Sequence, residues 1–460
     1  FGFGRAEGLA AEIQQETKEN PERFVALMKQ IPHQAHPTHV SHILWGMSEL
    51  KEVNTQLLKE AVIDAHERPG RPCGEGILRL FEKHPEIAQD SNMFNVLAWY
   101  VEHGEARQYQ ATEFSKAEAE IVSINNLINS SGKVYIHGMK SLRGRAAEAM
   151  GAVLWTAPEM AERAWEIIEQ RIDHEQLASV RCCLMRALVP LFNNDRLRCA
   201  SLLERLVKGP SKILAKGEQE HAHLLLAPLA THQGVRLFPY VLHWVPDIGR
   251  GLLDGLLNFD DEGMRMIGAW HLIGRSFQDE AYISEACRLI EMGLVYRRLA
   301  ADVASHAIIN EEFRERAEQL LVRFFDDEDK HVRQQAGDVF REIAPDEFFR
   351  FHGLAEAFLV SRSFRHDSFS FFHALEKATS SVHELVILAG EKLITDLETE
   401  NAVVSRRALD LHQFQKLLRR EYEASENNPE LRKRLLDLID RMLEIELYGT
   451  DKILKAHERE

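Results

Sequence analysis

Apolar residues recur every three or four positions along most of the chain, which is the spacing of one face of an α-helix. A clear example near the C-terminus is the stripe formed by Leu431, Leu435, Leu438, Met442 and Ile445. The alternation of apolar and polar residues that marks a half-buried strand is almost absent. Its best example is the three-residue segment 134–136. We therefore predict a nearly all-α fold.

A short element recurs along these helical segments. It consists of an apolar residue, then an arginine, then small or apolar residues three and six or seven positions later. Its clear copies contain Arg143, Arg181, Arg265 and Arg333. The first two arginines are 38 residues apart, and the 84 residues between the second and the third divide into two steps of 42. A period of about 35 to 42 residues with two helices per unit is typical of an α-solenoid, and we predict that fold.

The repeating unit resembles the HEAT repeat, in which an aspartate before the second helix and an arginine within that helix tie neighbouring repeats together. Asp261 precedes Arg265 by four residues, and Asp329 precedes Arg333 by the same distance. Each aspartate is also well placed to cap the helix that follows it. The two earlier copies lack this aspartate, so the repeats are degenerate.

The distribution of prolines and charges predicts three regions. Residues 1–115 are richer in proline and aromatic residues and are expected to form an irregular helical cap. Residues 116–418 are expected to form the HEAT-like array, and the highly charged residues 419–460 the capping helices at its other end. Caps are expected because a solenoid must shield the apolar faces of its terminal repeats.

Charge argues against a partner that is a polyanion. The 460 residues include 56 Lys and Arg against 72 Asp and Glu, which gives a formal net charge of −16. Proteins that bind nucleic acid without sequence preference depend on basic side chains that displace counterions from phosphates. A local basic groove is left open by this argument.

Cysteine usage and hydropathy bear on the compartment. The five cysteines are scattered and form no C-x-x-C pair, which favours a reducing cytoplasm. No stretch approaches the roughly 18 apolar residues of a membrane span.

The chain begins at Phe1 rather than at methionine, and we expect it to be a piece of a longer protein.

Histidines supply the candidate metal ligands. His33, His36, His39 and His42 follow one another at intervals of three residues. A zinc site would need several of these nitrogens to converge tetrahedrally, and Pro37 makes one continuous helix through them unfavourable. Exposed or hydrogen-bonded loop histidines are the competing interpretation, and we assign no metal and no cofactor.

No pattern of residues predicts catalysis within this chain. The G-x-S-x-G turn of serine hydrolases and the H-E-x-x-H zinc-protease motif are absent. Cys182 and Cys183 lie in an apolar helical pattern, where inert buried thiols are expected. About four of the six tryptophans are expected in the core, and any that is exposed on the concave face of the solenoid becomes a candidate for binding a partner protein.

Four segments of the first 155 residues carry a more specific resemblance: Pro21–Phe24, Ile43–Gly46, Met93–Tyr100 and His137–Ala149. Together they resemble the C-terminal helical region of large bacterial P-loop proteins of the STAND class, several of which act in antiviral defence. The resemblance implies that the helical array is a sensor. Binding of a foreign protein, such as a phage protein, would release an NTPase module to oligomerise and to switch on an effector, both outside this chain. Self-association would then come from those missing domains.

Three functions are therefore compared below. The first is a protein-recognition sensor of a bacterial defence protein, the second is a general HEAT-like scaffold or adaptor, and the third is a helical-repeat enzyme that acts on nucleic acid through a basic groove. The upstream coding sequence separates the first from the second, because a sensor requires a P-loop domain. Retardation of DNA at low salt tests the third.

Overall fold

The computed structural model describes residues 3–106, 133–208, 226–366, 368–379, 381–399, 408–445 and 450. All the regular secondary structure in these ranges is helical, which confirms the all-α prediction. The expected strand candidate is wrong, because residues 133–139 are helical. The chain divides into two compact units, Phe1–Gly268 and Ala269–Glu460. Each unit is described separately.

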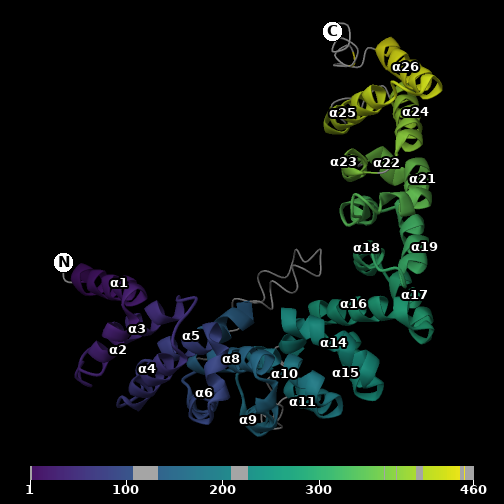
Figure 1. The fold of residues 1–460 in the computed structure, drawn as a ribbon. Coiled ribbons are helices and arrows are strands. Elements are labelled where there is room, and N and C mark those ends of the chain that lie inside the picture. Colours follow the sequence, from purple (N-terminus) through teal and green to yellow (C-terminus); the bar gives the residue numbers. More distant parts are fainter. Residues whose placement is uncertain are drawn as a thin grey trace. The chain divides into compact units, whose positions relative to one another are not determined.

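The first unit is a stack of helical hairpins in two rows (Figure 1). One row contains α1 (Phe3–Glu19), α3 (Thr38–Ser48), α5 (Gly74–Lys83), α8 (Leu142–Thr156), α10 (Ala178–Asn194) and α14 (His232–Trp244). The other row contains α2 (Pro21–Met28), α4 (Thr55–Glu67), α6 (Ser91–His103), α9 (Ala161–His174), α11 (Arg196–Lys208) and α15 (Pro246–Leu257). Successive helices within each row pack against one another, as expected of a solenoid.

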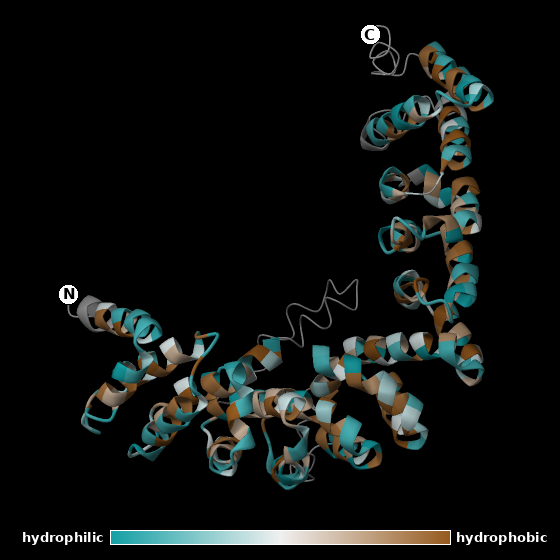
Figure 2. Cartoon of the chain, in the orientation of Figure 1, coloured by the Kyte–Doolittle hydropathy of each residue, from teal (hydrophilic) through white to brown (hydrophobic). Residues whose placement is uncertain are grey.

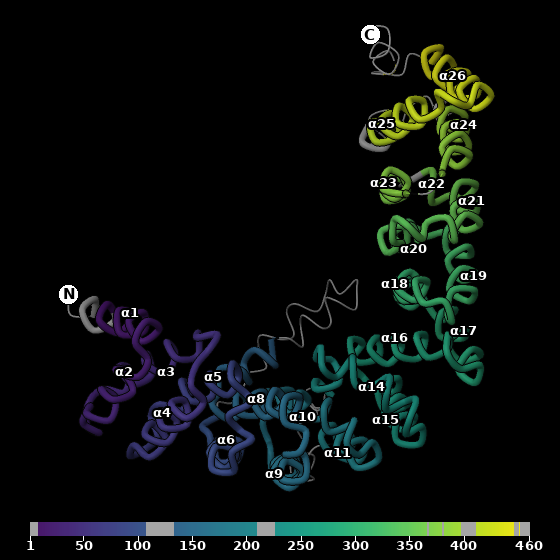
Figure 3. Tube along the Cα trace, in the orientation of Figure 1, coloured from purple at the N-terminus to yellow at the C-terminus, as the bar shows by residue number. Residues whose placement is uncertain are grey.

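The second unit repeats this arrangement and begins within α16 (Glu262–Gln278). One row contains α18 (Leu294–Ala307), α20 (Lys330–Gly337), α23 (Phe369–Lys377) and α25 (Ala408–Ala424). The other contains α19 (Arg314–Phe325), α21 (His352–Val360), α24 (His383–Thr399) and α26 (Pro429–Glu444), with α17 (Ile283–Glu291) packed on α18. The short α22 (Arg362–His366) joins α21 to α23. The alternation of the two rows can be followed along the trace in Figure 3.

Short 3-10 helices connect several of these elements. They are η1 (Pro85–Gln89), η4 (Pro158–Met160), η6 (Ala227–Ala230), η7 (Glu280–Tyr282), η8 (Asp338–Arg341) and η9 (Phe348–Phe351). The hairpin arrangement already begins at α1, within the region expected to be a cap. The predicted boundaries stay a prediction, and residue 115, where the first of them falls, lies outside the described residues.

The core of each unit lies between its two rows. Helices carry both hydrophobic and hydrophilic residues (Figure 2), and most of the buried residues are apolar. In α26 the predicted stripe is buried at Leu431, Leu435, Leu438 and Met442. In the second unit, the core contains edge-to-face phenylalanines, with ring centroids 4.9 Å apart between Phe340 and Phe358. Burial of one face per helix is therefore what holds each stack together.

Candidate functional site

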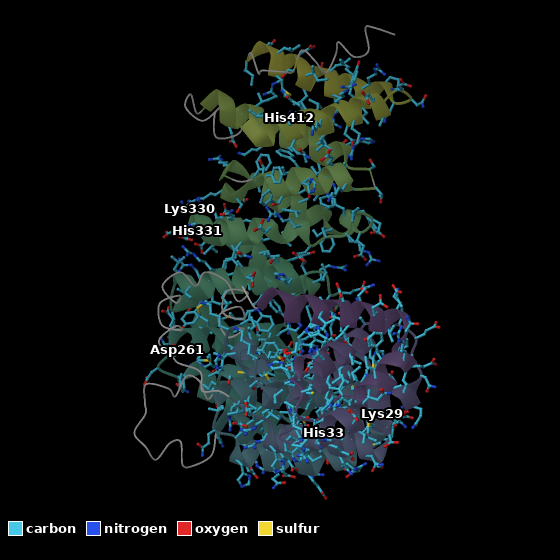
Figure 4. The ribbon with its side chains drawn as sticks, turned by 90° about the vertical axis from the view of Figure 1, so that its left-hand side faces the viewer. Lys29, His33, Asp261, Lys330, His331 and His412 are labelled. Carbon is cyan, nitrogen blue, oxygen red and sulfur yellow. The ribbon has the colours of Figure 1, made fainter. Side chains whose placement is uncertain are left out.

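The four clustered histidines do not converge on one point. His33 lies exposed in the turn after α2 (Figure 4), and His36 accepts or donates a 2.7 Å hydrogen bond with the Thr38 hydroxyl. His42 contacts Gln14 at 3.2 Å, and burial, together with nearby His39, lowers its pKa. Within the described ranges, no three His, Cys, Asp or Glu side chains are placed to hold a metal ion.

Two of the predicted repeat arginines have the same geometry. Arg265 donates from Nη1 to the carbonyls of Phe259 and Asp260, both at 2.8 Å. Arg333 donates from Nη1 to the carbonyls of Asp327 and Glu328, at 2.6 and 2.9 Å. In both cases the arginine reaches back five and six residues and fixes the loop before its own helix.

Replacing Arg333 with alanine is therefore expected to lower the free energy of unfolding by about 1 to 3 kcal/mol, because two carbonyls of the loop before α20 lose their donor. The side chain is buried, so water does not readily replace it. The change is measured by thermal melting followed by circular dichroism. Unchanged melting would show that the arginine has no structural role.

The predicted aspartates cap the helices that follow them. Asp261 lies at the start of α16 (Figure 4) and accepts a 2.9 Å hydrogen bond from the Met264 amide. Asp329 accepts from the amides of His331 and Val332, at 3.0 and 3.1 Å. Asp329 also accepts a 3.1 Å hydrogen bond from the guanidinium of Arg298, which belongs to the preceding hairpin. The link between neighbouring repeats thus joins Asp329 to Arg298.

The earlier repeat arginines are held by a buried carboxylate and by carbonyls. Arg143 donates to Glu175 at 3.2 Å, and Glu175 is 1 % exposed. Arg181 is fully buried and donates to the carbonyls of Glu175 and Arg205, both at 3.0 Å. Burial lowers the pKa of Arg181 to about 10, so the side chain stays charged at neutral pH. These two arginines connect α8, α9, α10 and α11.

One buried carboxyl group has a strongly shifted pKa. Burial raises the pKa of Glu148 to about 7, although Arg186 and a hydrogen bond from Tyr135 partly oppose this. Cys183 lies in the same region and, like Cys182, is buried, which raises the pKa of both thiols. High thiol pKa values agree with the expectation of inert cysteines.

Glu148→Gln is expected to change stability in a pH-dependent way. In the unfolded chain a glutamate ionises near pH 4.5, so between pH 4.5 and about 7 the folded protein keeps a proton that the unfolded chain has lost. Stability therefore falls as pH rises through this window. At pH 8 the variant is expected to be more stable than the parent by roughly 2 to 3 kcal/mol, and near pH 4.5 by much less. Melting both proteins at the two pH values tests this, and an equal difference at both would contradict it.

The six tryptophans differ widely in exposure. Trp165 is fully buried, Trp45, Trp99 and Trp270 are half-buried, and two are exposed: Trp155 at 53 % and Trp244 at 49 %. The sequence predicted that a tryptophan exposed on the concave face of the solenoid would mark an interaction surface. Of these two, Trp244 is the one with an arginine stacked on it.

Trp244 belongs to a group of exposed side chains on α14 and the start of α11. The guanidinium carbon of Arg196 lies 3.9 Å from the centroid of the Trp244 ring. Tyr240 is 60 % exposed, and its ring lies 6.5 Å from that of buried Phe192 at the end of α10. We call Arg196, Leu197, Arg236, Tyr240 and Trp244 the α11–α14 cluster.

Helical spacing explains why these side chains come together. Arg236, Tyr240 and Trp244 are separated by four residues each, so they lie along one face of α14. The packing of α14 against α10 brings this face to the corner where α10 ends and α11 begins. Sequence reasoning named Trp244 only as one of six tryptophans, without showing which of them would be exposed, and it missed the rest of the cluster. The four-residue spacing was the available signal.

Comparisons with known proteins assign no family. No protein-family model matches the chain, and no curated protein matches it. Among solved structures, an engineered protein determined by the Northeast Structural Genomics Consortium is similar over 92 % of this chain and 98 % of its own, with 13 % sequence identity and a TM-score of 0.29. That TM-score is too low to support an argument about fold or function.

No helix in the described ranges is long and apolar enough to cross a membrane.

Proposed function

We propose that this helical array is the sensing region of a larger bacterial defence protein and that it recognises a foreign protein, such as a phage protein. The observation that carries the proposal is the exposed α11–α14 cluster. It presents tryptophan, tyrosine and arginine side chains from two packed helices. These three residue types dominate the binding energy of protein interfaces. The resemblance of the first 155 residues to STAND-class sensors supplies the biological setting, in the cytoplasm.

The proposed mechanism is differential binding. A partner that contacts the array in only one of two arrangements of the larger protein shifts the equilibrium towards that arrangement, by its preference for it. A solenoid suits this role, because each repeat contacts only its neighbours and the stack presents a long lateral surface. The NTPase and effector steps belong to parts of the protein outside this chain.

A general scaffold or adaptor would use the same surface without a switching role. The two alternatives differ in what lies upstream and in what binding does. We expect the reading frame that encodes this chain to encode a P-loop domain before it, and we expect one phage protein, co-expressed with the whole protein, to arrest bacterial growth. A reading frame without a P-loop domain would instead favour the scaffold.

An enzyme that acts on nucleic acid is the third alternative. It would need a contiguous basic groove, whereas many arginines here face carboxylates: Arg145 pairs with Glu75 and Glu82 at 3.1 and 3.0 Å. Failure to retard DNA at low salt, where counterion release favours binding most, would end this alternative.

A further inference from the structure

The α11–α14 cluster is positively charged within an acidic chain. Helix α14 contains Arg236 and no Asp or Glu, while the whole protein carries a formal charge of −16. Arg196 and Arg236 are exposed, and neither forms an ion pair with any residue that the structure describes.

Two acidic residues lie near these arginines in the sequence, and each lies at the start of a helix. Asp195 precedes Arg196, but its carboxylate accepts a 3.0 Å hydrogen bond from the Arg198 amide and so caps α11. Asp247 lies in the first turn of α15, where a carboxylate is stabilised by the helix dipole. His243 packs edge-on against Trp244, with ring centroids 4.7 Å apart, and adds positive charge only when protonated.

The cluster also offers apolar surface beside these charges. Trp244 and Tyr240 are 49 and 60 % exposed, and Leu197, next to Arg196 in the chain, is 64 % exposed. Aromatic rings bury large areas on binding with little loss of conformational freedom. Arginine binds carboxylates through two parallel hydrogen bonds.

We propose that the α11–α14 cluster binds an acidic protein segment in which an apolar side chain, seated against Trp244 and Tyr240, is flanked by Asp or Glu that pair with Arg196 and Arg236. This inference rests on the proposed function and specifies the chemistry of its partner. Single-stranded nucleic acid also stacks on aromatic residues, but it requires a basic track along its backbone. Two arginines in a chain of net charge −16 favour the peptide.

Binding of short random-sequence peptides, displayed on an array, tests the inference with the full chain. We expect the strongest binders to be enriched in Asp, Glu and apolar residues and depleted in Lys and Arg. Trp244→Ala and the charge reversal Arg196→Glu are each expected to weaken the best binders by at least about tenfold. Trp155→Ala is the matched control, because Trp155 is equally exposed in the same unit, on α8, and its loss should leave binding unchanged.

Several results would overturn the inference. These are the absence of any acidic preference, a preference that survives Trp244→Ala, an equal loss in Trp155→Ala, or a single-stranded DNA that competes with the peptides for the cluster. Analytical ultracentrifugation could give a further contradicting result. If the parent chain sediments as a dimer and Trp244→Ala sediments as a monomer, the cluster binds a second copy of the chain. A circular dichroism melt of each variant excludes misfolding as the cause of lost binding.

Failure of the inference can be distinguished from failure of the proposed function. If a phage protein activates the Trp244→Ala variant and the parent protein equally well, the proposed sensor function is supported, but the α11–α14 cluster is not the surface that binds the phage protein. If the array prefers acidic peptides but no foreign protein activates the whole protein, the inference about the α11–α14 cluster is supported and the proposed sensor function is contradicted.

Discussion

Arg181→Ala is expected to lower the free energy of unfolding by about 4 kcal/mol. The side chain is fully buried and donates to the carbonyls of Ile172, Glu175 and Arg205, at 3.5, 3.0 and 3.0 Å. Alanine leaves these acceptors without a donor and also leaves a cavity. Because repeat arrays can unfold in parts, the effect is measured both as melting temperature and as hydrogen exchange of the α10 and α11 amides.

Arg23→Ala provides the comparison for this substitution. Arg23 is exposed on α2, and its replacement is expected to change stability by less than about 0.5 kcal/mol. Similar losses in the two variants would show that Arg181 contributes no more than a surface arginine. Accelerated exchange confined to α10 and α11 in Arg181→Ala would locate the loss at the hairpin junction, as expected.

Gly151→Leu is expected to lower the free energy of unfolding by more than about 3 kcal/mol, because α8 and α10 pack closely at this glycine. A Cβ atom at position 151 would lie 2.4 Å from Cγ of Arg186 and 2.8 Å from its backbone carbonyl. The arginine side chain can move, whereas the backbone of α10 can move only if the two helices separate. Thermal melting measures the loss, and a melting temperature within a degree or two of the parent would contradict the packing described here.

Gly251→Ala provides the comparison, and its expected effect on stability has the opposite sign. Gly251 lies in α15, and a Cβ atom there would have no neighbour within 4 Å. Alanine is expected to stabilise the protein by about 0.5 to 1 kcal/mol, since it reduces the freedom of the unfolded chain. The pair of glycines therefore separates the effect of helix contact from the effect of helix propensity.

The helical repeats could be predicted because they follow from local spacing. The three-to-four residue stride of apolar positions is a property of each helix, and the buried stripe in α26 matches it at Leu431, Leu435, Leu438 and Met442. The spacing of the repeat arginines likewise showed where helices begin. What it could not show was the acceptors, because the carbonyls of Glu175 and Asp327, to which Arg181 and Arg333 donate, lie in loops between helices.

The α11–α14 cluster was harder to predict, because the exposure of a side chain depends on which helices pack together. Trp165 and Trp244 lie in similar amphipathic stretches, yet the first is fully buried and the second is 49 % exposed. The stacking of Arg196 on Trp244 joins residues 48 positions apart and requires α14 to pack beside the α10–α11 corner. The same holds for the four candidate histidines, His33, His36, His39 and His42, because regular spacing along the chain does not by itself bring ring nitrogens to one point.

We propose that binding of a foreign protein to this array controls the activity of a larger protein. The most direct measurement is ATP hydrolysis by the protein encoded by the whole reading frame, alone and with the phage protein that arrests growth on co-expression. We expect the rate of hydrolysis to rise at least about tenfold with the phage protein, and we expect no rise when residues 1–460 are deleted. The same rate with and without the phage protein would contradict it.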